Sequence, residues 1–172
     1  MALVLNEDQM MLKEAAAGFL TEKASISALR GLRDTRDEIG FSVEIWREMA
    51  EMGWAGIAID EAHGGLGFGY TGLGVVLEQM GRNLSVSPLQ ASVLVGATAI
   101  SQAGSTSQKE TLLPAIAAGE LTLALALQEG RHHAPAKTAM RAAENGSGYT
   151  LTGEKVAVLD AHSADKLIVV AR

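Results

Sequence analysis

The chain has 172 residues, a formal net charge of −6 at pH 7 and no cysteine. This length suffices for one well-packed core, or for one domain and part of another. The lack of cysteine excludes disulfides, thiolate catalysis and cysteine-ligated metal centres, and the acidic balance argues against a general nucleic-acid binder. No apolar run approaches the ~20 residues of a membrane-spanning helix. We therefore expect neither nucleic acid nor a membrane among its partners.

The start of the sequence, Met1 to Asp8, has no basic segment and turns acidic at Glu7. A secretory signal peptide begins with a basic segment followed by an apolar one, so this start is not typical of one. Together with the absence of cysteine, this pattern predicts a cytoplasmic protein.

Local signals predict three helices before residue 53. Asn6 is placed to cap the first helix, and Gln9 can return the hydrogen bond. The apolar stripe of that helix consists of Leu12, Ala16, Phe19 and Leu20. A weaker helix is expected over about residues 26–33. Ser42 is the predicted cap of the third helix, whose buried face is Ile45, Met49 and Met52.

A glycine-rich stretch then separates two helices. Residues 55–59 are predicted to be extended, and the loop after them carries Gly64, Gly65, Gly67 and Gly69. Glycine loses more conformational freedom on folding than any other residue. So many glycines in one loop indicate turns with positive φ, or backbone that approaches a neighbour closely. We expect this loop to be ordered, with the next helix starting after Thr71.

Three further helical signals run to Gly119. Leu73, Val76, Leu77 and Met80 form the stripe of the first. Ser87 and Pro88 are a strong helix start, and residues 89–102 are apolar nearly all round, which is typical of an enclosed helix. Residues 107–110 (SQKE) are interpreted as a capping box, with a break or kink near Pro114 and an end at Gly119. The predicted first domain, residues 1–120, is therefore an all-α bundle.

The hydrophobic period changes after Gly119. Strand-length runs are expected at residues 121–127, 138–143, 149–152, 156–159 and 166–171, divided by turn-forming residues. Residues 149–156 are interpreted as a hairpin. About five short strands with one face to bury predict the start of an antiparallel β-domain, residues 121–172, that is incomplete in this sequence. The fold class is therefore α+β.

Three stretches in this order resemble the acyl-CoA dehydrogenase family. They read WREMAEMGWAGIAIDEAHGGLG (residues 46–67), LLPAIAAGELTLALALQE (residues 112–129) and GYTLTGEKVAVLDAHSADKLIVVAR (residues 148–172). The resemblance covers essentially the whole chain. It implies a helical N-terminal domain, a middle β-domain and a C-terminal helical domain that this sequence does not contain.

The resemblance also implies a function. Family members bind FAD and oxidise acyl-CoA thioesters at Cα–Cβ, and their electrons pass to an electron-transfer flavoprotein or a similar acceptor. A carboxylate of the C-terminal domain removes the α-proton in most members, so no catalytic residue is expected here. The isolated 172-residue chain should therefore be inactive. Assembly into a homo- or hetero-oligomer is implied too.

Two segments align with the flavin-contacting parts of the family. The predicted cofactor-binding residues are Leu125, Leu127, Gln128, Ala157, Val158 and Leu159. Gln128 stands where a hydroxyl usually meets the flavin, Ala157 where a tryptophan usually stands, and Leu159 where a second threonine is usual. The backbone amides of Leu127 and Leu159, and the Gln128 side chain, remain available as donors. These departures resemble family members that work as paired subunits, such as the small-subunit type of pimeloyl-CoA dehydrogenase.

Two functions therefore remain open: an active FAD-dependent acyl-CoA dehydrogenase, or a catalytically silent partner subunit of a heteromeric one. Other polar clusters are better explained as loops. His63 precedes two glycines as in the oxyanion segment of esterases, but the nucleophile elbow is lacking. His132 and His133 are adjacent and should point apart, and residues 160–165 contain ordinary turn formers. No metal site is predicted, and Glu129 is interpreted as polarity at a strand end.

Overall fold

The structure is a computed structural model and describes residues 4–172; Met1–Leu3, the first part of the acidic start, lie outside the described residues. Six α-helices form the N-terminal part: α1 (Glu7–Lys23), α2 (Ile26–Thr35), α3 (Val43–Glu51), α4 (Gly69–Asn83), α5 (Thr98–Ala103) and α6 (Thr106–Ala117). A π-helix, η3 (Leu89–Ala97), continues directly into α5, and short 3-10 turns are η1 (Trp54–Gly56), η2 (Glu61–His63) and η4 (Pro135–Lys137). In the described part of the chain, no helix has the length and apolar character needed to cross a membrane.

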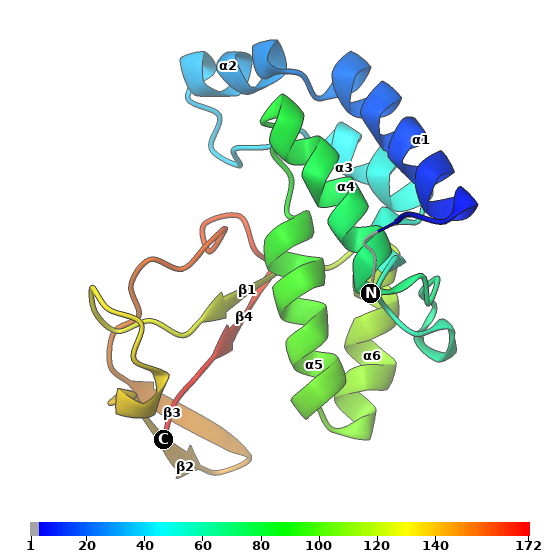
Figure 1. The fold of residues 1–172 in the computed structure, drawn as a ribbon. Coiled ribbons are helices and arrows are strands. Elements are labelled where there is room, and N and C mark those ends of the chain that lie inside the picture. The colour runs from blue at the N-terminus through cyan, green and yellow to red at the C-terminus, as the bar shows by residue number, and fades with distance from the viewer. Residues whose placement is uncertain (1–3) are drawn as a thin grey trace.

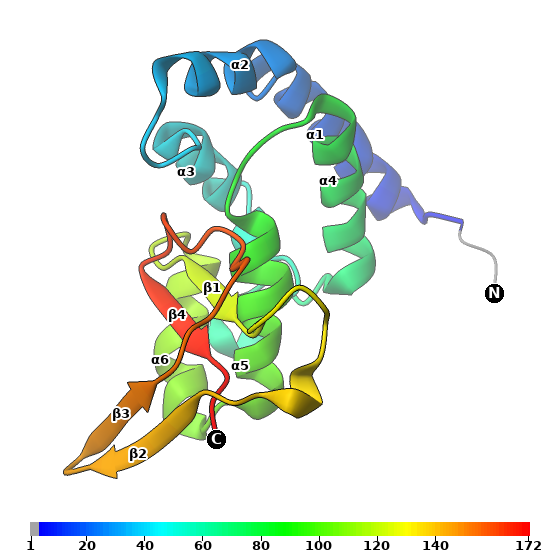
Figure 2. The same cartoon turned by 90° about the vertical axis from the view of Figure 1, so that its left-hand side faces the viewer.

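The strands follow the helices. They are β1 (Leu123–Ala126), β2 (Arg141–Asn145), β3 (Gly148–Thr152) and β4 (Lys166–Val169). The pair β1–β4 lies beside the continuous helix formed by η3 and α5, and the hairpin β2–β3 extends away from the helices (Figure 1, Figure 2). Helices followed by a few short strands confirm the predicted α+β class.

Several predicted caps are confirmed at the atomic level. The Asn6 side chain accepts from the Gln9 amide at 2.8 Å, and the Gln9 side chain accepts from the Asn6 amide at 3.1 Å. Ser42 Oγ accepts from the Ile45 amide at 3.3 Å. In α1 the stripe residues Ala16 and Leu20 are fully buried. Local sequence therefore fixes where these helices begin.

The glycine loop is ordered for both of the predicted reasons. Gly64, Gly67 and Gly69 have φ of +80°, +60° and +83°, which side chains other than glycine rarely adopt. Gly65 has no room for a side chain, because an added Cβ would lie 2.1 Å from the Ile59 carbonyl oxygen.

Some predictions for the residues around the glycine loop were wrong. Residues 55–59 are not extended: they coil through η1, and the carbonyls of Gly56 and Ile59 accept the amides of Leu66 and Gly67, both at 2.9 Å. The glycine loop thus takes the hydrogen bonds that a strand would need. Helix α4 begins slightly earlier than predicted, at Gly69, and Met52 is 39% exposed because α3 has already ended.

The last helix also differs from its prediction. Its cap is Ser105, whose hydroxyl accepts from the Gln108 amide at 3.2 Å while the Gln108 side chain accepts from the Ser105 amide at 2.8 Å. The helix continues through Pro114 to Ala117. Proline removes only its own N–H donor there, and burial of Leu113 and Ile116 on the same helix holds the turn in place.

The two strand pairs differ in direction. Strand β1 pairs in parallel with β4, Leu123 opposite Lys166, so this pair is not the antiparallel one expected. Strand β2 pairs antiparallel with β3, Asn145 opposite Gly148. The predicted hairpin over residues 149–156 is therefore wrong: the tight turn is Gly146–Ser147, and Gly146 has φ +64°. Residues 156–159 form no strand.

The core lies between the helices and reaches into β1. Its largest fully buried side chains include Leu20, Met49, Ile57, Leu73, Leu89, Val93, Leu113, Ile116 and Leu123. Three aromatic residues connect its layers: the rings of Phe19 and Trp54 meet edge to face with centroids 5.4 Å apart, and Trp46 Nε1 donates to the Gly119 carbonyl at 3.0 Å. The prediction that η3 is enclosed is confirmed, since most of its residues are buried.

Replacing Gly65 with alanine should destabilise the fold. The new Cβ would collide with the Ile59 carbonyl, and overpacking of this kind costs about 1–3 kcal/mol. Gly74 in α4 is the matched control, because it is exposed and an added Cβ there meets nothing within 4 Å. Gly74→Ala should be neutral or stabilising by up to about 1 kcal/mol. Urea unfolding measures both; equal midpoints for the two variants would contradict the packing argument.

Candidate functional site

The two segments predicted to contact a cofactor lie side by side. The amide of Val156 donates to the carbonyl of Gln128 at 2.8 Å. The Lys155 ammonium donates to the carbonyl of Leu127 at 3.2 Å. Residues 127–129, which follow β1, are thus joined to residues 155–156 although 26 to 28 positions separate them in sequence.

An ion pair reinforces this junction. Lys155 Nζ lies 2.7 Å from Glu129 Oε1, with side chains only 6% and 21% exposed. The Glu129 carboxylate also accepts the amides of Ala139, at 2.6 Å, and Met140, at 3.0 Å. The hydrogen bond from Lys155 and those two amides lower the pKa of Glu129 from about 4.5 to about 2. Glu129 therefore serves as an anchor of the backbone rather than as a base.

The segment after Lys155 leaves its backbone donors free. The amides of residues 157–160 donate to no other described residue, and Ala157 and Asp160 have φ of +50° and +56°. The side chains of Ala157 and Leu159 are exposed, whereas Val158 is half-buried. A short run of free N–H groups beside exposed apolar side chains suits a flat ligand that carries acceptors at its edge.

The other predicted residues follow β1. Leu125, Leu127 and Gln128 are half-buried. The Gln128 amide nitrogen lies 3.1 Å from His133 Nδ1, so the side chain already has a protein partner. A cavity of about 360 Å³ adjoins Gln128 and Glu129 and is bordered by the loop that carries Arg131, His132 and Lys137.

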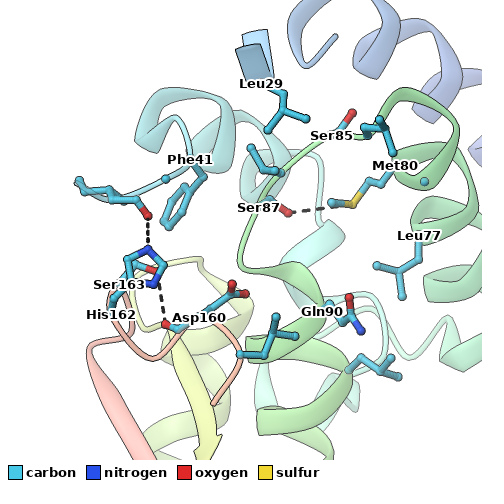
Figure 3. Close-up of a pocket in the computed structure, with 17 residues that line it drawn as sticks. Leu29, Phe41, Leu77, Met80, Ser85, Ser87, Gln90, Asp160, His162 and Ser163 are labelled. Carbon is cyan, nitrogen blue, oxygen red and sulfur yellow. Dashed lines mark hydrogen bonds between the residues drawn. The ribbon is translucent and has the colours of Figure 1, made fainter. Parts of the chain in front are cut away.

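A larger cavity begins at the end of residues 157–159. Its volume is about 610 Å³, and Leu159 lies in its wall. Residues of α2, α4, η3, the loop before α3 and residues 159–163 line it (Figure 3). Most of its wall is apolar, and the main contributors are Leu29, Phe41, Leu77, Met80 and Leu94.

Hydrogen bonds hold residues 162–165 against the loop before α3 and the residue before β1. His162 Nε2 lies 3.0 Å from the Ile39 carbonyl across the cavity rim (Figure 3). The Asp165 carboxylate accepts both the amide and the hydroxyl of Thr122 at 2.8 Å. The cavity wall thus combines three parts of the chain that are remote in sequence.

The remaining polar clusters centre on histidine residues. In residues 4–172 no group of three or more His, Asp or Glu side chains is placed to hold a metal ion. His162 is engaged with Ile39, and His133 with Gln128. Nδ1 of His63 is buried without a partner among the described residues.

Sequence reasoning missed Lys155 and the large cavity. Lys155 belongs to the same Gly-Glu-Lys stretch that aligned with the family, so its position was available as a signal. The cavity was not, because its wall joins residues 29–41, 77–94 and 159–163, which no local pattern connects.

The anchor predicts a pH dependence of stability. The pKa of Glu129 is lower in the folded chain than in the unfolded one, so its contribution is complete above about 4.5 and is lost as pH falls toward about 2. Glu129→Gln should lose stability at neutral pH and show a shallower decline between those values. Glu144→Gln, which changes an exposed carboxylate of β2, is the control. Unfolding midpoints that run parallel for wild type and Glu129→Gln from pH 5 to pH 2.5 would contradict the assignment.

The chain is similar in sequence to known proteins of one family. The family model for the acyl-CoA dehydrogenase N-terminal domain matches residues 6–120. Acyl-CoA dehydrogenase FadE12 of Mycobacterium tuberculosis is 34% identical over 134 residues, which are 75% of this chain and 34% of that protein. Mitochondrial isovaleryl-CoA dehydrogenase of Bos taurus is 29% identical over 171 residues, 98% of this chain and 40% of that protein.

Solved structures agree over nearly the whole chain. The Tcur3481-Tcur3483 steroid ACAD superposes with a TM-score of 0.85 at 34% identity, covering 96% of this chain and 45% of that one. The ChsE4-ChsE5 complex of Mycobacterium tuberculosis gives a TM-score of 0.83 at 27% identity, covering 99% and 45%. The chain spans about a third to two fifths of the curated relatives named above. It belongs to the acyl-CoA dehydrogenase family.

Proposed function

We propose that the chain forms part of an FAD-dependent acyl-CoA dehydrogenase, which oxidises an acyl-CoA thioester at Cα–Cβ to the enoyl-CoA. One observation carries this proposal: the segment that fits a flavin edge, residues 157–159, runs directly into the wall of the large apolar cavity at Leu159. A hydride acceptor and an acyl chain have to meet in such a reaction, and these residues offer a surface for each.

The residues present fit a flavin without the usual side chains. The free amides of Ala157, Val158 and Leu159 can donate to acceptors of the ring system, and the exposed faces of Ala157 and Leu159 can lie against it. Bound FAD would supply the hydride acceptor. The part of this chain is to present donors in a fixed geometry, which Lys155 and Glu129 hold.

The apolar cavity is the proposed place of the acyl chain. Its volume of about 610 Å³ lies in the range of small-ligand sites. Helices α4 and η3 supply rigid walls, so the chain can bury an alkyl group without remodelling its core. We assign no catalytic base to these residues. We also propose that the boundary between the helical domain and the β-domain lies between residues 120 and 121.

A silent partner subunit is the second candidate. Two observations favour it: Ala157 offers no ring for stacking, and the Gln128 amide is already engaged by His133. Two of the structurally similar proteins are named as pairs, Tcur3481-Tcur3483 and ChsE4-ChsE5. As a silent partner, the chain contributes a cavity wall to a hetero-oligomer whose other subunit holds the flavin. With either function, the electrons removed from the substrate pass to an electron-transfer flavoprotein or a similar acceptor.

Filling the cavity should weaken binding of an acyl group. Gln90 is exposed and lines the cavity, so Gln90→Phe adds bulk there without touching the core. The 172-residue chain should bind decanoyl-CoA more tightly than CoA alone, and Gln90→Phe should weaken decanoyl-CoA binding at least about tenfold, a change of about 1.4 kcal/mol. Calorimetry measures both affinities.

The control for that experiment is Gln102→Phe, which places the same ring on exposed α5 outside the cavity wall. It should leave the affinity for decanoyl-CoA unchanged. Equal affinity of the wild-type chain for decanoyl-CoA and for CoA would contradict the proposed acyl site.

Gln128 distinguishes the two candidate functions. If this chain contacts FAD, Gln128→Ala in the native assembly should weaken FAD binding by about tenfold, since a hydrogen bond to a charged or strongly polar acceptor contributes about 1.5–3 kcal/mol at most. Gln128→Thr, which restores the hydroxyl usual in the family, should keep binding near the wild-type level. Flavin fluorescence measures the affinity. FAD affinity unaffected by Gln128→Ala would favour the partner-subunit function.

A further inference from the structure

Asp160 carries a half-buried carboxylate that faces the large cavity. Figure 3 shows its side chain directed away from His162 and toward the side of the cavity where Gln90 lies. Burial raises the pKa of Asp160, and the neighbouring His162 opposes this only in part. A carboxylate removed from water without a partner is unfavourable, so its place in an apolar wall calls for an explanation.

The serines and the histidine of the wall have partners. Ser85 Oγ donates to the Ala24 carbonyl at 2.6 Å, Ser87 Oγ accepts the Leu89 amide at 3.3 Å, and His162 is bound to Ile39. The Asp160 carboxylate, by contrast, accepts no hydrogen bond and forms no ion pair with any residue between 4 and 172. The Gln90 amide is also unpaired within that range.

The backbone carbonyl of Asp160, and not its carboxylate, accepts the hydrogen bonds of the turn that follows. The Asp160 carbonyl accepts the amides of Ser163, at 3.2 Å, and Ala164, at 3.1 Å, as well as Ser163 Oγ at 3.3 Å. These bonds fix the residue at φ +56°, a conformation that aspartate tolerates better than most residues. The turn that precedes β4 therefore fixes the backbone of Asp160 at the cavity wall.

We infer that Asp160 determines specificity by accepting a hydrogen bond from a hydroxyl group on an otherwise apolar acyl chain. The apolar wall around it would hold the carbon skeleton, and the O–H would donate to the carboxylate at the cavity's polar side. An acyl chain without the hydroxyl would displace water from the carboxylate and would not replace the lost hydrogen bonds. This inference rests on the proposed function, because it names the acyl group that the same cavity selects.

Matched thioesters test the inference on the 172-residue chain. The probes are decanoyl-CoA, ω-hydroxydecanoyl-CoA and a mid-chain hydroxydecanoyl-CoA, with affinities measured by calorimetry. At least one hydroxylated thioester should bind about tenfold more tightly than decanoyl-CoA. Asp160→Gly should abolish that preference and strengthen decanoyl-CoA binding, because no unpaired carboxylate then has to be desolvated. Glycine accepts φ +56° without strain, so the variant should fold.

The conservative variant Asp160→Asn separates recognition from packing. Its amide oxygen still accepts a hydrogen bond but carries no charge, so the preference should fall to an intermediate value. A merely structural role of Asp160 would change all three affinities together. If the wild-type chain binds the three thioesters equally, or if Asp160→Gly keeps the preference, the inference is overturned while the proposed acyl site stands. If no thioester binds, both the role of Asp160 and the proposed acyl site are contradicted.

Discussion

The pairing of Glu129 with Lys155 is the constraint on which the candidate site depends. Two charges with 21% and 6% exposure would be costly if either lacked a partner. Here the ammonium also reaches the Leu127 carbonyl, and the carboxylate also binds two backbone amides. The pair therefore fastens three separate backbone segments at one point. With residues 155 and 156 fixed there, residues 157–160 emerge with their amides unpaired, which makes them available to a ligand.

A second polar contact ties this region to the helices. Ser92 is fully buried in the otherwise apolar η3, and its Oγ lies 2.9 Å from the Leu123 amide and 3.3 Å from the Leu123 carbonyl. Gly96, one turn later, leaves room for Leu123, since a Cβ there would lie 2.8 Å from Leu123 Cβ. One hydroxyl and one missing side chain thus set the position of β1 on the helix. Because β4 pairs with β1, the residues that precede β4 are brought onto the cavity as well.

Features set by neighbouring residues were predictable, and features set by distant ones were not. The caps at Asn6 and Ser42 and the stripe of α1 depend on residues within one or two turns. The strand predicted at residues 156–159 failed because its apolar pattern is real but Gln128, far away in sequence, takes the Val156 amide and no ladder continues. The hairpin was misplaced because two glycine turns compete locally, and only the pairing of β2 with β3 selects Gly146. The cavity depends entirely on such distant contacts.

The backbone of residues 157–160 connects stability with function. Ala157 and Asp160 both adopt positive φ, which costs about 1–2 kcal/mol for a residue with a Cβ. Glycine would remove that strain, yet neither position has it. At Asp160 the reason is visible, because the strained turn is what directs a carboxylate into an apolar wall. The hydrogen bonds of His162 to Ile39 and of Asp165 to Thr122 enclose the segment on its C-terminal side, as Lys155 does on its N-terminal side. The strain is therefore held by anchors outside the segment, so the residues facing the cavity are left free to meet a ligand.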